Sequence, residues 1–587
     1  MWAVARLLAD QGDVSVVTSS RWRNRYEELL RDGDPRLPQG VRFAFADEPS
    51  GDRTPFVSWH HLWSLRLLEA AAALHPDGGP DILEVADYQA EGFAAAHARR
   101  GLDPRLRNTA LAVRLQTSAE MCAALNEDLN DLHLRVLSGV ERFTLRFADA
   151  LLWPGGNSLD WYTDFYGEGA LAPAVRCPLP MIDDLAVPSY SDLPSTEGPL
   201  RLLYLNRLER RKGVVELVTA VRSLPDAQLA LTLVGRDTMT GPGGGSMRTH
   251  LEDLAEGDAR IEFVDQVPHA EVPRLITEHH ALVVPTRWET FSYVVREALA
   301  CNRPVLATPA GGIVDVVRPG ESGWLADSSS PDELAATLRE VLEGRELIAQ
   351  MVGQRRPRRV FEEGSVEERN LEVYRELVER PHERPPPPAA GRASHVGVAA
   401  IVACEPGGGD PVPTLLSLEH QRGASVQSVM LADRSGRFPD GRALLHARTA
   451  LAAPRRHGRP AAWATGLEAT SEELVLLLTA GTVLARDFVA RAAAALAREP
   501  SVAWVTSFVG EGARAWDAPL GNYALPVEEL DPTSLVVLAR RWALEGVLGD
   551  PDSAPGNERK LLAALANASA YGLVLQEPLV ENAPRPR

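Results

Sequence analysis

The stretch PTRWETFSYVVREALACNRPV, residues 285–305, organises the rest of this chain. It overlaps the apolar run at residues 281–285, which predicts a buried strand, and it opens a helix with Thr290 or Ser292 as the expected N-cap. Asn302 stands where the helix should end, at a position that favours a residue tolerant of positive φ. The stretch therefore predicts a strand, a loop and a helix, with the loop at the strand's carboxyl end.

Two acids in this stretch, Glu289 and Glu297, have a spacing that suits a cleft. Glu289 lies in the loop and Glu297 lies about two turns further along the helix. The apolar face of that helix is expected to comprise Phe291, Val294, Val295 and Ala298. Glu297 falls at the edge of this face and Arg296 is expected to point away from it. The alternative is an ordinary amphipathic helix with two surface acids.

This stretch resembles the signature of the retaining family-4 glycosyltransferases of the GT-B fold. That signature is a Glu-x7-Glu pair inside the pattern PS-x-x-E-x-F-x-x-x-x-x-E-A-x-x-x-G-x-P-V. The spacing, Phe291, Pro304 and the following Ala310-Gly311-Gly312 agree with it, and Asn302 replaces the usual glycine. The resemblance implies a GT-B fold in which two Rossmann-like, doubly wound α/β domains face a cleft.

A second motif follows the predicted strand at residues 200–205. Arg207 comes just after this strand, and Lys212 lies at the start of the next helix, so two cations stand beside free backbone N–H groups. This arrangement suits a diphosphate. It also resembles the family's G-R-L-x-x-x-K-G motif, with Asn206 replacing the first glycine. A basic turn that is merely solvated is the alternative.

The resemblance implies roles for particular residues on the donor side. Glu289 would contact hydroxyls of the transferred sugar, Glu297 would bind the ribose, and Arg207 and Lys212 would stabilise the leaving diphosphate. The implied catalytic set is Arg207, Lys212 and Glu289. The implied donor-binding set is Asn206, Phe291, Ser292, Glu297, Gly235 and Gly312. The implied mechanism needs no metal and no cofactor beyond the nucleotide-sugar substrate.

The acceptor side is expected at two strand ends in the first part of the chain. Asp87 and Tyr88 follow a predicted strand that starts near residue 80, and a helix-capping role for Asp87 is the alternative to acceptor contact. Gln116 follows the strand at residues 111–115, where the family often carries a histidine. Because an amide does not titrate, proton chemistry is not expected at Gln116.

The chain begins with a predicted helix at residues 1–12 and a strand at residues 14–18. In the glycosyltransferase family that this chain resembles, these elements come second, after a first strand and a Gly-rich loop at the cleft. We expect a start codon placed too far downstream, and the alternative is that the chain has lost these elements.

Composition shifts divide the chain into domains. We expect an acceptor-side domain at residues 1–190, a donor domain at 191–380 and a Pro-rich linker at 381–394. The last domain, residues 395–587, faintly resembles the family-2 glycosyltransferases of the GT-A fold. The strand end that should carry an Asp-x-Asp metal site reads LLTAGT at residues 477–482, with no acid, so we expect an accessory domain without catalytic activity. The alternative is an active acid elsewhere, for instance Asp487 or Asp517.

Charge and composition exclude several classes of protein. The 587 residues are 45% hydrophobic and 24% charged, as in a globular protein, and the formal charge of −19 argues against a nucleic-acid partner. No apolar run approaches the roughly 18 residues of a spanning helix. We expect a cytoplasmic protein. Its basic runs at residues 21–25 and 355–359 could touch the inner membrane face, although solvated surface charge is the simpler interpretation.

The expected activity is transfer of a sugar from a nucleotide-diphosphate donor to an acceptor hydroxyl of a glycan, a glycolipid or a small-molecule glycoside. A non-catalytic scaffold that binds nucleotide sugars or glycans is the alternative. An epimerase or phosphorylase on the same fold is a further one. The four cysteines, Cys122, Cys177, Cys301 and Cys404, are scattered without the spacing of a metal site or a disulfide framework.

Overall fold

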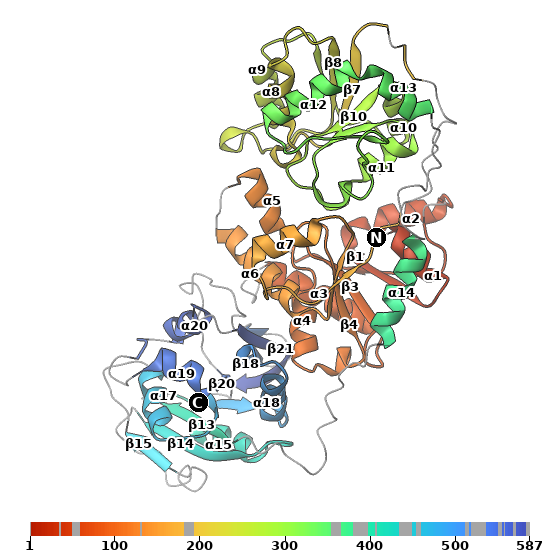
Figure 1. The fold of residues 1–587 in the computed structure, drawn as a ribbon. Coiled ribbons are helices and arrows are strands. Elements are labelled where there is room, and N and C mark those ends of the chain that lie inside the picture. The colour runs from red at the N-terminus through yellow and green to blue at the C-terminus, as the bar shows by residue number, and fades with distance from the viewer. Residues whose placement is uncertain are drawn as a thin grey trace.

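The computed structural model describes most of the chain. The described residues are 2–34, 37–49, 59–128, 132–180, 193–195, 197–353, 366–379, 397–405, 408–433, 449–452, 459–510, 516–517, 536–549, 554–556, 558–567 and 571–582. The Pro-rich linker, the basic run at 355–359 and the expected domain boundaries lie outside them. We call residues 2–180 the first half, residues 193–353 the second half and residues 397–582 the third unit (Figure 1).

The second half is a six-stranded parallel sheet with the order β12-β11-β10-β7-β8-β9. The strands are β7 (Leu200–Leu205), β8 (Leu229–Val234), β9 (Ile261–Val264), β10 (Ala281–Val284), β11 (Val305–Ala307) and β12 (Gly323–Leu325). The helices are α8 (Val214–Arg222), α9 (Met247–Ala255), α10 (Val272–Thr277), α11 (Tyr293–Ala300), α12 (Pro331–Glu343) and α13 (Arg345–Gly353). The strand order reverses between β7 and β10, and such a switch point leaves a crevice at the carboxyl ends of these strands.

The first half holds two parallel sheets. One pairs β1 (Val14–Ser19) with β2 (Val41–Ala46), and the other has the order β3-β4-β5-β6, from β3 (Ile82–Ala86), β4 (Ala110–Arg114), β5 (Ala150–Trp153) and β6 (Ala174–Arg176). Its helices are α1 (Trp2–Ala9), α2 (Arg23–Arg31), α3 (Trp59–Leu74), α4 (Phe93–Arg100), α5 (Ala119–Asn126), α6 (Leu132–Phe147) and α7 (Ser158–Tyr166). Within the described residues no ladder joins β1 to β3. The two α/β halves with parallel sheets make a GT-B-like arrangement.

The third unit is built on a mixed sheet with the path β15-β14-β13-β16-β20-β18-β21-β17, and β19 pairs with β18. The strands are β13 (Val398–Cys404), β14 (Val426–Asp433), β15 (Thr449–Ala452), β16 (Leu474–Thr479), β17 (Thr482–Leu484), β18 (Val502–Gly510), β19 (Trp516–Asp517), β20 (Val537–Arg540) and β21 (Tyr571–Asn582). The helices are α15 (Pro411–Glu419), α17 (Arg459–Glu468), α18 (Phe488–Arg498), α19 (Arg541–Leu548) and α20 (Glu558–Asn567). β13 to β16 run parallel, whereas β20 runs antiparallel to β16.

The third unit packs directly on the first half, where β21 lies beside α4 (Figure 1). The backbone N–H of Val574 donates to His97 Nδ1 at 2.9 Å, and His97 is fully buried. Arg100 and Glu499 form an ion pair at 2.7 Å across the same contact. Buried apolar side chains of both parts belong to one continuous cluster. The third unit is therefore more than a tethered appendage, because it shares a core with the first half.

Helix α14 (Val366–Glu379) follows the second half in sequence but packs on the first half. Its Tyr374 hydroxyl accepts a hydrogen bond from Arg114 Nη2 at 3.0 Å. Arg114 is fully buried and pairs with Glu84 at 2.7 Å, which compensates the burial of its charge. A helix that follows the second half in sequence thus completes the packing of the first half.

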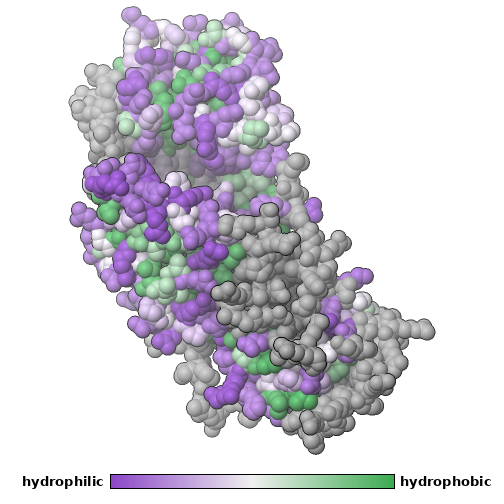
Figure 2. Space-filling view, turned by 180° about the vertical axis from the view of Figure 1, so that it is seen from behind, coloured by the Kyte–Doolittle hydropathy of each residue, from purple (hydrophilic) through white to green (hydrophobic). Residues whose placement is uncertain are grey.

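The face of the molecule in Figure 2 is mainly hydrophilic over the second half, at the top, with apolar residues interspersed. In the described part of the chain, no helix is both long and apolar enough to cross a membrane. The basic run at residues 21–25 is exposed, and Arg21 and Arg25 in it pair with Glu48 and Glu28.

Candidate active site

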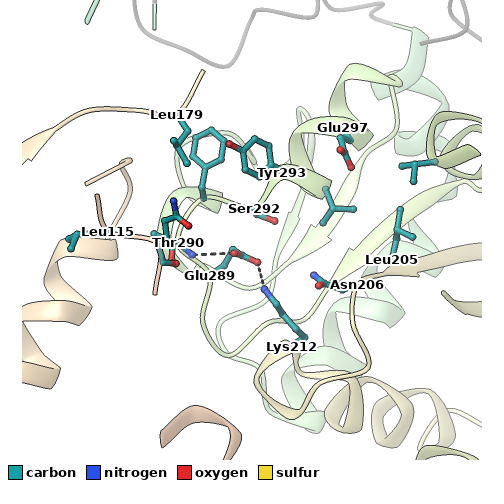
Figure 3. A pocket seen from close by; sticks show the side chains of 14 residues that line it. Leu115, Leu179, Leu205, Asn206, Lys212, Glu289, Thr290, Ser292, Tyr293 and Glu297 are labelled. Atoms are coloured by element: carbon teal, nitrogen blue, oxygen red, sulfur yellow. Dashed lines mark hydrogen bonds and ion pairs between the residues drawn. The ribbon is translucent and has the colours of Figure 1, made fainter. Parts of the chain in front are cut away.

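A cavity of about 530 Å³ lies between the two halves (Figure 3). The first half contributes Leu115, Gln116 and Leu179 to its wall. The second half contributes Leu205, Asn206, Lys212, Val272, Glu289, Thr290, Phe291, Ser292, Tyr293, Val294 and Glu297. The cavity therefore sits at the switch point of the second sheet, and it gathers residues from both predicted motifs.

Lys212 and Glu289 form an ion pair in the wall of this cavity. Lys212 Nζ lies 2.7 Å from Glu289 Oε2, and the two side chains are 8% and 14% exposed. Burial lowers the pKa of Lys212, and the Glu289 carboxylate opposes that shift. Burial alone would raise the pKa of Glu289, but the charge and hydrogen bond of Lys212 outweigh it and hold that pKa below its usual value. Lys212 is one of only two lysines in the sequence, the other being Lys560.

Two glycines allow the loops that carry this pair to meet. Gly213 has φ 71°, and a Cβ there would lie 1.7 Å from the carbonyl oxygen of Pro285. Gly311 has φ 54°, and a Cβ there would lie 1.5 Å from the carbonyl oxygen of Glu289. Only glycine fits both the left-handed conformation and the close approach. These two positions therefore fix Lys212 and Glu289 against each other.

The predicted donor-binding glycines lie behind the cavity wall. A Cβ at Gly235 would lie 1.7 Å from the carbonyl oxygen of Asn206, so Gly235 backs the loop that follows β7. Gly312 donates its backbone N–H to the carbonyl oxygen of Thr290 at 3.0 Å. Neither glycine lines the cavity, and both support residues that do.

Helix α11 begins with its amino end at the cavity. Ser292 occupies the expected N-cap position, but its backbone is in the left-handed region, with φ 56° and ψ 81°, and its side chain makes no capping hydrogen bond. Asn302 has φ 55°, which confirms the prediction of positive φ beyond the helix end.

The prediction that Arg296 points away from the apolar face is wrong. Arg296 is 8% exposed, its Cζ lies 3.6 Å from the centre of the Phe291 ring, and Nη1 donates to the carbonyl oxygen of Phe291. The reason is the left-handed turn at Ser292, which places Phe291 outside the register of α11. Phe291 then packs against the first half beside Leu179.

Glu297 and Asn206 line the cavity as predicted. In Figure 3 Glu297 lies on α11, on the side of Ser292 away from Glu289. Its Oε1 lies 3.1 Å from Nε2 of His269, a residue whose side chain is 71% exposed. Asn206 follows β7 and lies opposite Ser292, with its side-chain oxygen accepting from the N–H of Arg207 at 3.0 Å.

Arg207 does not line the cavity. Its Nη2 pairs with Glu209 Oε2 at 2.9 Å, and its side chain is 47% exposed. Glu209 is buried and also pairs with Arg211 at 3.1 Å and accepts from Asn126 Nδ2 of the first half at 2.9 Å. This carboxylate could not be singled out from the sequence, because its contact with Asn126 joins residues 83 positions apart.

The structure separates the three expected acceptor-side residues. Gln116 is exposed and lines the cavity, whereas Asp87 is buried behind it and Tyr88 lies outside the wall, 44% exposed. Asp87 Oδ1 accepts from the N–H of Gln116 at 2.9 Å and of Thr117 at 3.4 Å, and Oδ2 accepts from the Tyr162 hydroxyl. Burial raises the pKa of Asp87 to about 6, and these hydrogen bonds oppose the shift. Asp87 therefore holds the Gln116 loop, and it caps neither α4, whose N-cap is Gly92, nor α5, whose N-cap is Ser118.

Thr117 links this loop to the second half, and sequence analysis missed it. Its φ of 147° is unusual for a β-branched residue. Its hydroxyl lies 2.7 Å from that of Thr290 and accepts from Trp288 Nε1 at 3.1 Å. Asn157 of the first half makes a second link, donating to Pro309 O at 2.9 Å and accepting from Gly311 N at 2.6 Å. Contacts from the first half thus hold the loop that carries Glu289, through Thr290 and Trp288, and the neighbouring loop after β11, through Pro309 and Gly311.

Comparison with known proteins identifies the part of the chain that bears most of this cavity. Residues 191–357 match the model of the family "Glycosyl transferases group 1". The chain is 32% identical over 213 residues to a glycogen synthase of Mycobacterium tuberculosis, a match that covers 36% of this chain and 49% of that protein. It is 30% identical over 191 residues to a D-inositol 3-phosphate glycosyltransferase of Catenulispora acidiphila, covering 31% of this chain and 46% of that protein. The chain spans about half the length of these curated relatives.

A solved structure of sucrose-phosphate synthase from Thermosynechococcus elongatus aligns with 64% of this chain and 91% of that chain, at 21% identity and a TM-score of 0.48. The family match itself covers both motifs of the cavity, because Lys212, Glu289 and Glu297 all lie within it. Residues 191–357, which carry these three side chains, are therefore the part of the chain that is similar to the glycosyl transferases group 1 family.

Proposed function

We propose that this chain is a retaining glycosyltransferase of family 4, which moves a sugar from a nucleotide-diphosphate donor to an acceptor hydroxyl without a metal ion. The observation that supports this most is the buried Lys212–Glu289 pair in a cavity between two α/β halves, within the domain that matches the family. A cation, a carboxylate and a helix amino end meet in one cavity, as a charged and hydroxyl-rich ligand requires.

Each part of the donor has a place in this proposal. The diphosphate lies at Lys212 and the amino end of α11, where positive charge is concentrated. Glu297 accepts hydrogen bonds from the ribose, and Glu289 accepts them from the transferred sugar. Arg207 joins as a second cation by leaving its half-exposed contact with Glu209, since it directly follows Asn206 in the cavity wall.

The proposed step breaks the bond between the anomeric carbon and the diphosphate oxygen and forms a bond from the same face to the acceptor oxygen. The acceptor hydroxyl proton passes to the departing diphosphate, so Gln116, which does not titrate, need not act as a base. Negative charge grows on the leaving oxygen in the transition state. Removing Lys212 should therefore lower the rate on the order of 10²-fold, as expected for a lost preorganised charge contact.

The acceptor enters from the first half in this proposal. Gln116 and Leu115 line that side of the cavity, and Asp87 orients Gln116 from behind. The names of the relatives indicate two acceptor classes worth testing, a glucan such as glycogen and a polyol phosphate such as D-inositol 3-phosphate.

We also propose that the third unit resembles a GT-A domain and does not catalyse transfer. The loop at the end of β16 has no carboxylate, and Gly409 packs against it so closely that a Cβ would lie 2.6 Å from the carbonyl oxygen of Ala480. Two acids would be needed at this strand end to hold a divalent ion, and residues 477–482 supply none.

The test is thermal stabilisation of the full chain by a panel of nucleotide sugars, with and without a chelator. Binding of a ligand to the folded state raises Tm. We expect one donor class to stabilise the wild type equally in both conditions and to stabilise Lys212→Met far less. Stabilisation without any transfer to glycogen or D-inositol 3-phosphate would favour the scaffold, and turnover with water or phosphate alone would favour the epimerase or phosphorylase.

A further inference from the structure

Ser292 adopts a conformation that its side chain does not favour. With φ 56° and ψ 81° it lies in the left-handed region, which glycine enters without strain and serine does not. A serine kept in such a conformation is expected where its side chain serves a purpose that glycine cannot. The left-handed turn therefore indicates that the hydroxyl of Ser292 has a function.

The hydroxyl of Ser292 has no hydrogen-bond partner in the described part of the chain, and the residue is only 4% exposed. A serine at an N-cap usually accepts a hydrogen bond from the first turn of its helix, but Ser292 makes none. Buried polar groups are nearly always paired, because leaving one unpaired destabilises the protein. A ligand in the cavity would supply the missing partner.

The position of Ser292 indicates which part of a ligand it meets. In Figure 3 the side chain of Ser292, a residue of the cavity wall, lies between Glu289 and Glu297, and Lys212 reaches toward the same region. The next two residues, Tyr293 and Val294, line the cavity at the amino end of α11. The partial positive charge of that helix end and the cation of Lys212 both favour an anion there.

We infer that the hydroxyl of Ser292 donates a hydrogen bond to a phosphate oxygen of a nucleoside diphosphate bound at the amino end of α11. This inference rests on the proposed function, in which Glu297 binds the ribose and Glu289 binds the sugar. The diphosphate joins ribose and sugar, so it must occupy the space between these two carboxylates, where Ser292 lies.

The experiment compares Ser292→Ala and Ser292→Gly in the full chain by calorimetric titration with UDP, GDP and ADP. Ser292→Ala removes the hydroxyl and keeps the strained backbone, whereas Ser292→Gly removes both the hydroxyl and the strain. We expect both variants to bind the nucleoside diphosphate about 10-fold or more weakly, because a hydrogen bond to a charged group is lost. Ser292→Gly should have a Tm no lower than the wild type.

Ser322→Ala is the matched control. Ser322 is equally buried, at 4% exposure, but its hydroxyl is paired with Arg318 N at 2.8 Å and Val316 O at 3.2 Å, and it lies outside the cavity wall. Its substitution should lower Tm and leave nucleotide affinity unchanged.

The outcomes separate this inference from the proposed function. Unchanged affinity in Ser292→Ala and Ser292→Gly, with a wild type that binds, would overturn the role of the hydroxyl and leave the proposed function standing. Loss of affinity for the intact nucleotide sugar but not for the nucleoside diphosphate would overturn the assignment to phosphate. A wild type that binds none of the three diphosphates would overturn both.

Discussion

Replacing Glu289 with glutamine should change the ionisation of Lys212, because the two groups share one buried site. Their side chains are 14% and 8% exposed, and the atoms that pair them lie 2.7 Å apart. Removing one partner of such a pair leaves an uncompensated charge, which typically destabilises a protein by about 3–5 kcal/mol. In Glu289→Gln the carboxylate that raises the pKa of Lys212 is gone, whereas burial still lowers that pKa.

The sign of the pH dependence follows from the direction of this shift. The unfolded chain then holds the lysine proton more tightly than the folded chain, so the free energy of unfolding of Glu289→Gln increases as the pH rises toward the usual lysine pKa. At low pH the folded variant must keep Lys212 charged in a buried site, and the destabilisation is largest there. The double variant Lys212→Met/Glu289→Gln should recover much of the loss, because neither charge remains.

Because the sequence contains only two lysines, NMR can follow the ionisation of Lys212 selectively. Protein labelled with [13C]lysine at Cε contains only Lys212 and Lys560, so two resonances report the two ionisations, and Lys560 serves as the internal control. We expect the Lys212 resonance to titrate at lower pH in Glu289→Gln than in the wild type, with Lys560 unchanged. A Lys212 titration that does not move would refute the coupling of the two charges. Nucleotide affinity in Glu289→Gln should be retained while turnover falls, and an equal loss of both would refute the role of Glu289 at the sugar.

Three further predictions concern other parts of the site. Glu297→Gln should weaken nucleotide binding without lowering Tm, as calorimetry and thermal unfolding would show, and unaltered affinity would contradict its role at the ribose. Asp87→Ala should lower turnover more than nucleotide affinity, because Gln116 loses its support. Wild-type turnover should rise as the pH increases through about 6, where Asp87 ionises, and a pH profile that Asp87→Asn leaves intact would count against this. Adding Mn²⁺ or Mg²⁺ to full-length Lys212→Met should not restore turnover, whereas metal-dependent activity would place catalysis in the third unit.

The full chain is the proper material for that last experiment. The third unit shares a buried core with the first half, and an isolated fragment would expose the surface around β21 that His97 and its neighbours cover. An inactive fragment could then reflect a damaged fold, so the Lys212→Met variant isolates the third unit more cleanly.

Local pattern predicted the second half well. The strands expected at residues 200–205 and 281–285 agree with β7 and β10, because buried parallel strands are short apolar runs bounded by polar residues. The positive φ of Asn302 was also predictable, since the end of a helix restricts which residues fit there.

Features that depend on distant contacts could not be predicted in this way. The burial of Arg296 follows from one left-handed residue, Ser292, whose conformation no local rule favours. The contact of Glu209 with Asn126 and that of His97 with Val574 join residues 83 and 477 positions apart. Such pairs form only when separate elements pack together, so a pattern of neighbouring residues in the sequence does not predict them.

The most direct test of the central claim is turnover of the donor that stabilises the protein, measured in the presence of a chelator and an acceptor alcohol. The account predicts release of the nucleoside diphosphate only with the acceptor, a glycoside whose anomeric configuration by NMR is that of the donor, and a rate lower on the order of 10²-fold in Lys212→Met. An inverted product, a strict need for a divalent metal, or full activity in Lys212→Met would contradict it.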